Sequence, residues 1–138
     1  MIHGIGVSNF SLDQLKEAMA KSHHPIVAVQ NYYNLANRTK TSPEFLAYCQ
    51  KEQIAFIAPK PLERGLLLEE PWKSRLDPLA KKYNKTPSQI ALAWLLGQEN
   101  IHVIPKATSL NHIQENIEAA DIVFTSEDQK YLDKIVLQ

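Results

Sequence analysis

The 138-residue sequence predicts an α/β fold in which four parallel strands alternate with helices and one further helix ends the chain. Short apolar segments recur along the sequence, and each is followed by residues at the spacing of an amphipathic helix. Continuous apolar strands that alternate with helices are typical of parallel sheets with right-handed crossovers. Each apolar segment also ends near a polar residue. Because ligands bind at the carboxyl ends of strands in such folds, we expect a binding site along one edge of the sheet.

The first predicted strand covers Ile5 to Val7 and ends at the polar pair Ser8 and Asn9. A helix is expected next, because Ser11 and Gln14 have the spacing of a capping box, in which each side chain binds the backbone N–H of the other residue. An apolar stripe at helical spacing continues this helix, and it consists of Leu12, Leu15, Ala18 and Met19.

The second predicted strand, Ile26 to Gln30, follows Pro25 directly and is rich in β-branched residues. Ser42 and Pro43 then have the pattern of a helix start, because serine caps the first turn and proline fits its first position. The third strand is expected over Ile54 to Ala58, ahead of the segment PKPLERG, whose proline and glycine residues indicate a loop.

The second half of the chain is expected to contain the fourth strand and four helices. The strand is His102 to Ile104, and Lys106 follows it. Thr86, with Pro87 after it and Gln89 at capping-box spacing, indicates the start of the helix that precedes this strand. The other three helices are expected over Leu76 to Tyr83, Ser109 to Ala119 and Thr125 to Leu137.

Composition and charge are those of one ordinary globular domain over residues 1–138, with 44% hydrophobic and 22% charged residues. Fifteen Lys and Arg balance fifteen Asp and Glu, which disfavours nucleic acid or an anionic membrane as a partner. No apolar run has the length of a membrane span, and the first residues lack a signal-peptide pattern. The single cysteine, Cys49, suits a reducing compartment, so a cytoplasmic location is expected. No metal site is expected either, because no His or Cys pair has ligand spacing.

Five motifs, in this order, resemble the C-terminal half of the aldo-keto reductases. They are IGVSNFSLDQL, VAVQNYYNL, PLERGLL, TPSQIALAWLL and VIPKATSLNHIQEN, and they extend from near residue 4 to near residue 133. Members of this family are TIM-type (β/α)8 barrels that reduce carbonyl groups with NADPH. The resemblance therefore implies half of such a barrel, namely its strands five to eight.

The same resemblance assigns cofactor-binding positions for NADP or NAD. Ser8, Asn9 and Gln30 match residues that hydrogen-bond the nicotinamide carboxamide. Leu62 matches a residue whose backbone lies along the pyrophosphate, and Lys106 matches a lysine near the adenosine 2′-phosphate. Further positions of the adenosine site are matched by Thr108, His112, Glu115 and Asn116. Several of these residues also have a structural explanation. Ser8 and Asn9 could end a strand and prepare a helix cap, Gln30 could be a hydrogen-bonded amide at the barrel mouth, and Lys106 could be an ordinary solvated lysine.

Two positions depart from the family pattern. Pro59 stands where most relatives have a tyrosine that stacks on the nicotinamide, and proline has no π face. His112 stands where many relatives have an arginine for the 2′-phosphate, and neutral histidine lacks the charged guanidinium fork. Weak binding is therefore expected, with NADH as an alternative to NADPH. The tyrosine, lysine, aspartate and histidine of family catalysis belong to the first half of the barrel, so no residue here is assigned a catalytic role.

Two functions follow from these observations. The chain is either the cofactor-binding part of a carbonyl reductase, inactive alone, or a non-catalytic half-barrel scaffold that associates with itself. A four-stranded half has two open sheet edges and an inner face, and such surfaces promote association. We expect a homodimer or higher oligomer, or pairing with a separate chain that supplies the N-terminal half. By position, the apolar inner face is expected to contain Ile5, Val7, Val27 and Val29.

Overall fold

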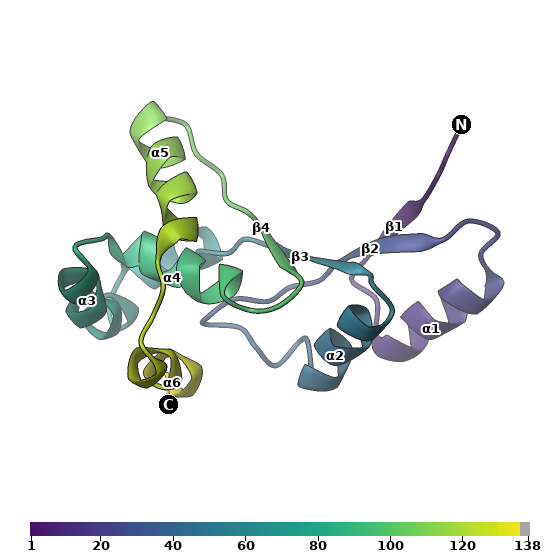
Figure 1. The fold of residues 1–138 in the computed structure, drawn as a ribbon, viewed down its shortest axis with the longest axis horizontal. Coiled ribbons are helices and arrows are strands. Elements are labelled where there is room, and N and C mark those ends of the chain that lie inside the picture. Colours follow the sequence, from purple (N-terminus) through teal and green to yellow (C-terminus); the bar gives the residue numbers. More distant parts are fainter. Residues whose placement is uncertain (136–138) are drawn as a thin grey trace.

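A computed structural model of the chain, which describes residues 1–135, contains one four-stranded sheet (Figure 1). Its strands are β1 (Ile5–Ser8), β2 (Ile26–Gln30), β3 (Ala55–Pro59) and β4 (Ile101–Ile104), and they lie side by side in chain order. All three neighbouring pairs are parallel. The predicted α/β fold with four parallel strands is confirmed, and the strand bounds differ from the prediction by no more than one residue at either end.

Within residues 1–135, six α-helices and two short 3-10 helices lie between and after the strands. The α-helices are α1 (Leu12–Lys21), α2 (Pro43–Lys51), α3 (Trp72–Tyr83), α4 (Pro87–Leu96), α5 (Leu110–Glu118) and α6 (Ser126–Lys134), and the 3-10 helices are η1 (Glu63–Leu68) and η2 (Ala119–Asp121). Both predicted capping boxes form, one between Ser11 and Gln14 and one between Thr86 and Gln89. The side chain of Ser42 caps α2 as predicted.

Three elements differ from the prediction. The helix predicted from Leu76 begins at Trp72, because the two side chains lie one turn apart and both are buried. The last helix ends at Lys134, since Ile135 has the extended backbone angles φ −66° and ψ 111°, and the predicted end at Leu137 lies outside the described residues. The loop predicted after the third strand contains η1.

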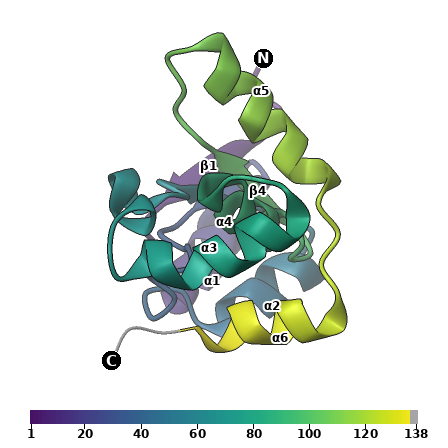
Figure 2. The same ribbon diagram turned by 90° about the vertical axis from the view of Figure 1, so that its left-hand side faces the viewer.

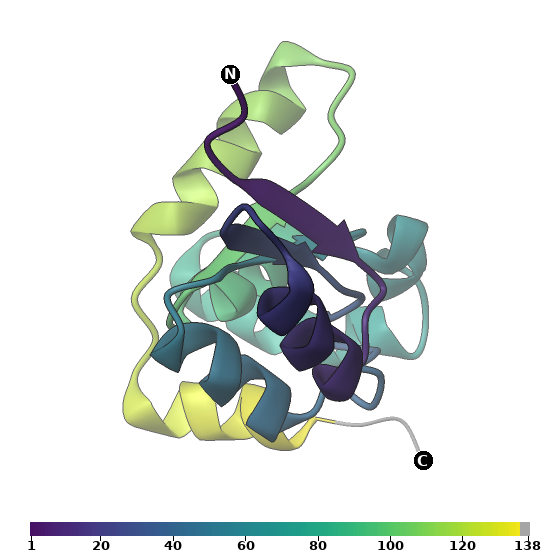
Figure 3. The ribbon, with the colours of Figure 1, turned by 90° about the vertical axis from the view of Figure 1, so that its right-hand side faces the viewer.

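The core lies between one face of the sheet and the helices (Figures 2 and 3). Val29, Phe56 and Ile101 are register neighbours on three successive strands, so their side chains share a face, and all three are buried. Cys49 and Trp94 are buried with them, and burial raises the pKa of the Cys49 thiol to about 11. Among the described strand residues, none on the opposite face is buried: Gly6, Ser8, Ala28, Gln30, Ile57, Pro59, His102 and Ile104.

The prediction for the inner face of the sheet is wrong. Val29 is fully buried, and Ile5 and Val7 pack against the same helix-facing core. Val27 lies at an irregularity in the pairing of β1 with β2 and is half-exposed. Large apolar side chains face the helices because only there do other apolar groups cover them. The opposite face carries mostly small and polar side chains, together with Ile57 and the half-exposed Ile104.

The C-terminal helix α6 is held in place by Arg38. Its guanidinium donates to the backbone oxygens of Leu132, Asp133 and Ile135, at N–O distances of 2.7, 2.6 and 3.1 Å. Backbone carbonyls in the last turn of a helix lack partners within the helix, and a cation satisfies them well. The guanidinium carbon of Arg38 also lies 4.4 Å from the ring centroid of Trp94, so α6 is tied to the core through α4.

Asp128 ties the first turn of α6 to α3. Lys82 Nζ, Tyr83 Oη and Thr125 Oγ1 donate to its Oδ2, at 2.7, 2.5 and 2.7 Å. The hydrogen bond from the Lys82 ammonium, followed by those from Tyr83 and Thr125, lowers the pKa of Asp128 from its ordinary value of 3.8 to about 2. Folding therefore favours the ionised carboxylate.

We predict that this pairing contributes stability that acid removes. Because the folded-state pKa of Asp128 is depressed, its contribution is complete above pH 3.8 and is lost as the pH falls toward about 2. The midpoint of thermal unfolding, followed by circular dichroism, should fall less across this window in Asp128→Asn than in the wild type. Asp13→Asn, which removes an exposed carboxylate from α1, is the control. An equal fall in the wild type and Asp128→Asn would contradict the prediction.

Candidate functional site

The carboxyl ends of β1 and β2 bring three of the predicted residues together. Ser8 and Gln30 are register partners, and Ser8 Oγ donates to the backbone oxygen of Gln30 at 3.1 Å. The backbone N–H of Asn9 donates to the same oxygen at 3.1 Å. Asn9 has a left-handed backbone with φ 58°, a conformation that asparagine tolerates better than most residues. Ser8, Asn9 and Gln30 therefore form one polar cluster at the sheet edge.

A buried amide next to this cluster fixes the two strand ends to each other. Asn31 Oδ1 accepts from the backbone N–H of Phe10 at 3.1 Å, and Asn31 Nδ2 donates to the Phe10 oxygen at 2.7 Å. This reciprocal pair satisfies the buried side chain and sets where the chain leaves β1. The sequence prediction did not include Asn31. Its position directly after Gln30, at the end of a predicted strand, already placed it next to the expected site.

The loop after β3 contains an unusual run of left-handed residues. Lys60, Glu63 and Arg64 have φ values of 53°, 50° and 57°, and Gly65 has 100°. Such angles cost on the order of 1 kcal/mol for each residue that is not glycine. The loop therefore needs contacts from outside itself to keep this shape.

Glu63 supplies those contacts. Its carboxylate accepts hydrogen bonds from the Tyr32 hydroxyl and from Asn34 Nδ2, the latter at 2.6 Å. Asn34 Nδ2 also donates to the backbone oxygen of Lys60 at 3.0 Å. Partial burial, and then the hydrogen bond to Glu63, raises the pKa of Tyr32 to about 12, so its hydroxyl stays a donor at neutral pH. The loop after β2 thus holds the loop after β3.

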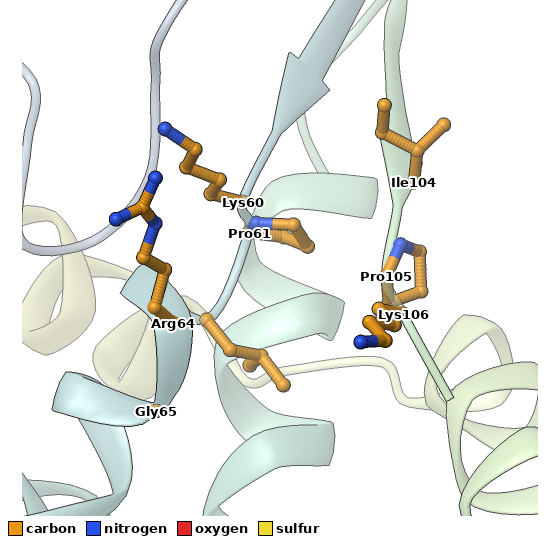
Figure 4. Close-up of a pocket in the computed structure, with 8 residues that line it drawn as sticks. Lys60, Pro61, Arg64, Gly65, Ile104, Pro105 and Lys106 are labelled. Carbon is orange, nitrogen blue, oxygen red and sulfur yellow. The ribbon is translucent and has the colours of Figure 1, made fainter. Parts of the chain in front are cut away.

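A cavity of about 480 Å³ opens between this loop and the end of β4 (Figure 4). Lys60, Arg64 and Lys106 lie in its lining, together with Leu62, and no acidic side chain does. The ammonium group of Lys106 points across the gap toward the η1 loop, while the charged ends of Lys60 and Arg64 lie near each other and point away from β4. Lys60 and Arg64 also line a neighbouring cavity with the carboxylate of Glu63, so Lys106 is the cation beside β4 that favours an anion such as a phosphate in this groove.

The other predicted adenosine-site residues lie on α5 or, for Thr108, just before it. Thr108 and His112 are exposed at the start of this helix. The backbone oxygen of Glu115 accepts from the buried side chain of Gln89 at 3.1 Å. Asn116 lines a different cavity, of about 500 Å³, between α5, α4 and β4. The structure therefore does not bring these four residues into the groove that contains Leu62 and Lys106.

The cluster at β1 and β2 and the cationic groove at β3 and β4 are connected through Lys60 and Arg64. Both line the groove, and both also line a cavity of about 450 Å³ that Asn9 and Tyr32 share. From β1 to β4 the sheet edge covers three strand spacings, or about 14 Å. One ligand that touches both ends must be extended, with polar groups at one end and negative charge at the other.

The sequence prediction missed Arg64, although it lines both cavities. The sequence did offer a reason to consider Arg64. It precedes Gly65 in the segment PKPLERG, which was predicted to be a loop after a strand. Within the part of the chain that the structure describes, no group of three His, Cys, Asp or Glu side chains could hold a metal ion. No helix among residues 1–135 is long and apolar enough to cross a membrane.

A parallel sheet covered by helices on one face, with polar groups at its carboxyl edge, is the architecture of part of a (β/α) barrel. The chain belongs to the aldo/keto reductase family, whose family model matches residues 1–137. It is 36% identical over 135 residues to an uncharacterized oxidoreductase of Schizosaccharomyces pombe, covering 97% of this chain and 42% of that protein.

Two solved structures show the same fold. A thermostable aldo-keto reductase, Tm1743, crystallised with the inhibitor epalrestat, matches with a TM-score of 0.84 and 43% identity over 94% of this chain and 47% of its own. An aldo-keto reductase from Klebsiella pneumoniae in complex with NADPH matches with a TM-score of 0.80 and 28% identity, over 94% and 46%. The chain thus spans less than half the length of these relatives.

We predict that Glu63→Ala destabilises the protein by about 1–3 kcal/mol, because Tyr32 and Asn34 lose a charged acceptor and the left-handed loop loses its support. Urea unfolding followed by tryptophan fluorescence measures this free energy. Glu69→Ala, which removes an exposed carboxylate at the end of η1, is the control and should change stability by less than about 0.5 kcal/mol. Equal effects of the two substitutions would show that Glu63 does not hold the loop.

Proposed function

We propose that this chain is the C-terminal half of an aldo-keto reductase barrel and that it binds NAD(P)H along the carboxyl edge of its sheet. The observation that carries the proposal is the pairing of a hydrogen-bonding cluster at one end of this edge with a cationic groove at the other. The order of the five motifs supports assignment to strands five to eight. Family membership and the NADPH complex of the Klebsiella relative support the choice of ligand.

In this proposal the cofactor extends from β1 to β4. Ser8, Asn9 and Gln30 bind the nicotinamide carboxamide, whose amide offers both donors and an acceptor. The Leu62 backbone follows the pyrophosphate, and Lys106 binds the adenosine 2′-phosphate. These residues fit NAD(P)H. The groove that contains Leu62 and Lys106 is cationic, and the cluster at the ends of β1 and β2 is neutral and polar.

Arg64 is the second cation that we assign to the phosphates. Its left-handed backbone keeps it beside Lys60, within reach of the connection between the two cavities. At the adenosine end, the exposed Thr108 and His112 and the partly buried Glu115 and Asn116 contact the ligand only if α5 moves toward the groove. With Pro59 in place of an aromatic ring and His112 in place of an arginine, binding is weak, and both NADPH and NADH are accepted.

Carbonyl reduction needs a proton donor beside the carbonyl oxygen, in addition to the hydride of the cofactor. Tyr32 lies near the site, but its hydroxyl already donates a hydrogen bond to Glu63, and the pKa of this hydroxyl is raised to about 12. Tyr83 does contact a lysine and an aspartate, but on helices α3 and α6, where it donates to Asp128 and accepts from the backbone N–H of Thr125. We therefore propose that the chain is inactive until the first half of a barrel is supplied.

A second candidate function is a non-catalytic scaffold that associates with itself. The observation that favours it is α5, where none of the nine described residues is buried. The two functions are distinguished by the cofactor, because a scaffold has no need to bind a dinucleotide.

We predict that Lys106→Ala weakens binding of NADPH by about tenfold or more and leaves binding of NADH nearly unchanged, because only NADPH carries the 2′-phosphate. Isothermal titration calorimetry measures both affinities. Lys130→Ala, at an exposed lysine of α6, is the control and should bind like the wild type. Identical NADPH titrations of wild type and Lys106→Ala would count against the assignment, and NADPH binding to neither would reject the proposed function.

We also predict that the purified chain alone does not oxidise NADPH in the presence of simple aldehydes. The proton donor and its charged neighbours contribute many orders of magnitude to such reactions, and the chain offers no replacement. Loss of NADPH absorbance at 340 nm is the measurement, with a full-length family member as positive control. Turnover that persists after rigorous removal of host reductases would refute the prediction.

A further inference from the structure

Helix α5 exposes an apolar stripe. Leu110, Ile113 and Ile117 lie at helical spacing and are 84%, 44% and 62% exposed. Ile113 and Ile117 also line the cavity of about 500 Å³ that α5 forms with α4 and β4. In all three views of the fold, α5 projects from the rest of the molecule (Figures 1, 2 and 3). A stripe of this size beside an open cavity marks an interaction surface.

The sheet has two unpaired edges, and one of them adjoins this stripe. In the described chain β1 and β4 are the outer strands, and each pairs along one side only. On β1, the side chains of Ile5 and Val7 face the helix side but are only partly buried. The helix-facing side of β1 is therefore partly open along its outer edge.

We propose that two copies of this chain form a closed dimer, in which β4 of each copy pairs in parallel with β1 of the other. Each α5 then lays Ile113 and Ile117 over Ile5 and Val7 of the second copy. The two surfaces complement each other, because α5 exposes Leu110, Ile113 and Ile117 beside β4 while Ile5 and Val7 of β1 are only partly buried.

The number of copies follows from the size of the half-barrel. A head-to-tail contact forms either a closed ring or an open filament, depending on the rotation between copies. This chain contains four parallel strands, and it superimposes on 47% of a full-length relative. Two copies therefore supply the eight strands that close a barrel of this type. The zero net charge of each chain adds no electrostatic repulsion to this pairing.

This inference rests on the edges and on α5 and is independent of the proposed cofactor. Its test is Ile117→Asp, which places a charge in the centre of the contact. Because Ile117 is 62% exposed in the single chain, the variant should fold like the wild type, and circular dichroism checks this. Asn111→Asp is the matched control, since it adds the same charge to α5 at an exposed position away from the stripe.

Multi-angle light scattering at tens of micromolar should give the wild type and Asn111→Asp a mass of twice 15.7 kDa. Ile117→Asp should have the mass of one chain, with a dimer dissociation constant raised more than about tenfold. Hydrogen exchange should protect the outer amides of β1 and β4 in the wild type, and this protection should be lost in Ile117→Asp.

Four results would overturn the proposal. They are a monomeric wild type, a dimer that survives Ile117→Asp, a dimer whose β1 and β4 edge amides exchange without protection, and a wild type that assembles only when a separate first-half chain is added. The last result would assign the surface to that chain in place of a second copy.

Discussion

Parallel pairing of the four strands determines where every residue of the candidate site lies. Because all four strands run in the same direction, their carboxyl ends meet at one edge, and the register places Ser8 beside Gln30 and Pro59 beside Ile104. Residues that are far apart in sequence, from Asn9 to Lys106, therefore border connected cavities. The polar end and the cationic end of this edge are separated because β1 and β4 are at opposite sides of the sheet.

The same constraint leaves surfaces that the chain does not cover. Helices bury one face of the sheet. No described strand residue on the opposite face is buried, Ile57 and Ile104 included, and β1 and β4 each have an open edge. Long-range polar contacts at the periphery add to the stability that the buried apolar core supplies. Arg38 binds the end of α6, Asp128 binds its start to α3, and Glu63 holds the strained loop of the site. The loop that carries Lys60 and Arg64 is thus fixed by its neighbours, and this would reduce the ordering cost of binding a ligand there.

Local patterns were sufficient to predict the strands to within one residue at either end and every helix start except that of α3. The capping boxes at Ser11 and Thr86 depend only on residues three positions apart, and both formed. Contacts between distant residues, such as Glu63 with Tyr32, have no local signal and were not predicted. The inner-face prediction failed because alternation in a strand shows which residues share a face but not which face the helices cover. The extension of α3 to Trp72 was obscured by prolines on both sides of its first turns.

The most direct test of the central claim is a titration with NADPH followed by backbone amide chemical shifts. If one extended dinucleotide occupies the carboxyl edge, resonances at both ends of that edge move together with a single dissociation constant. These are the amides of Ser8, Asn9 and Gln30 at one end and of Leu62, Arg64 and Lys106 at the other. Shifts confined to one end, or shifts that spread over the helices and leave the edge unchanged, would contradict a dinucleotide site along this sheet.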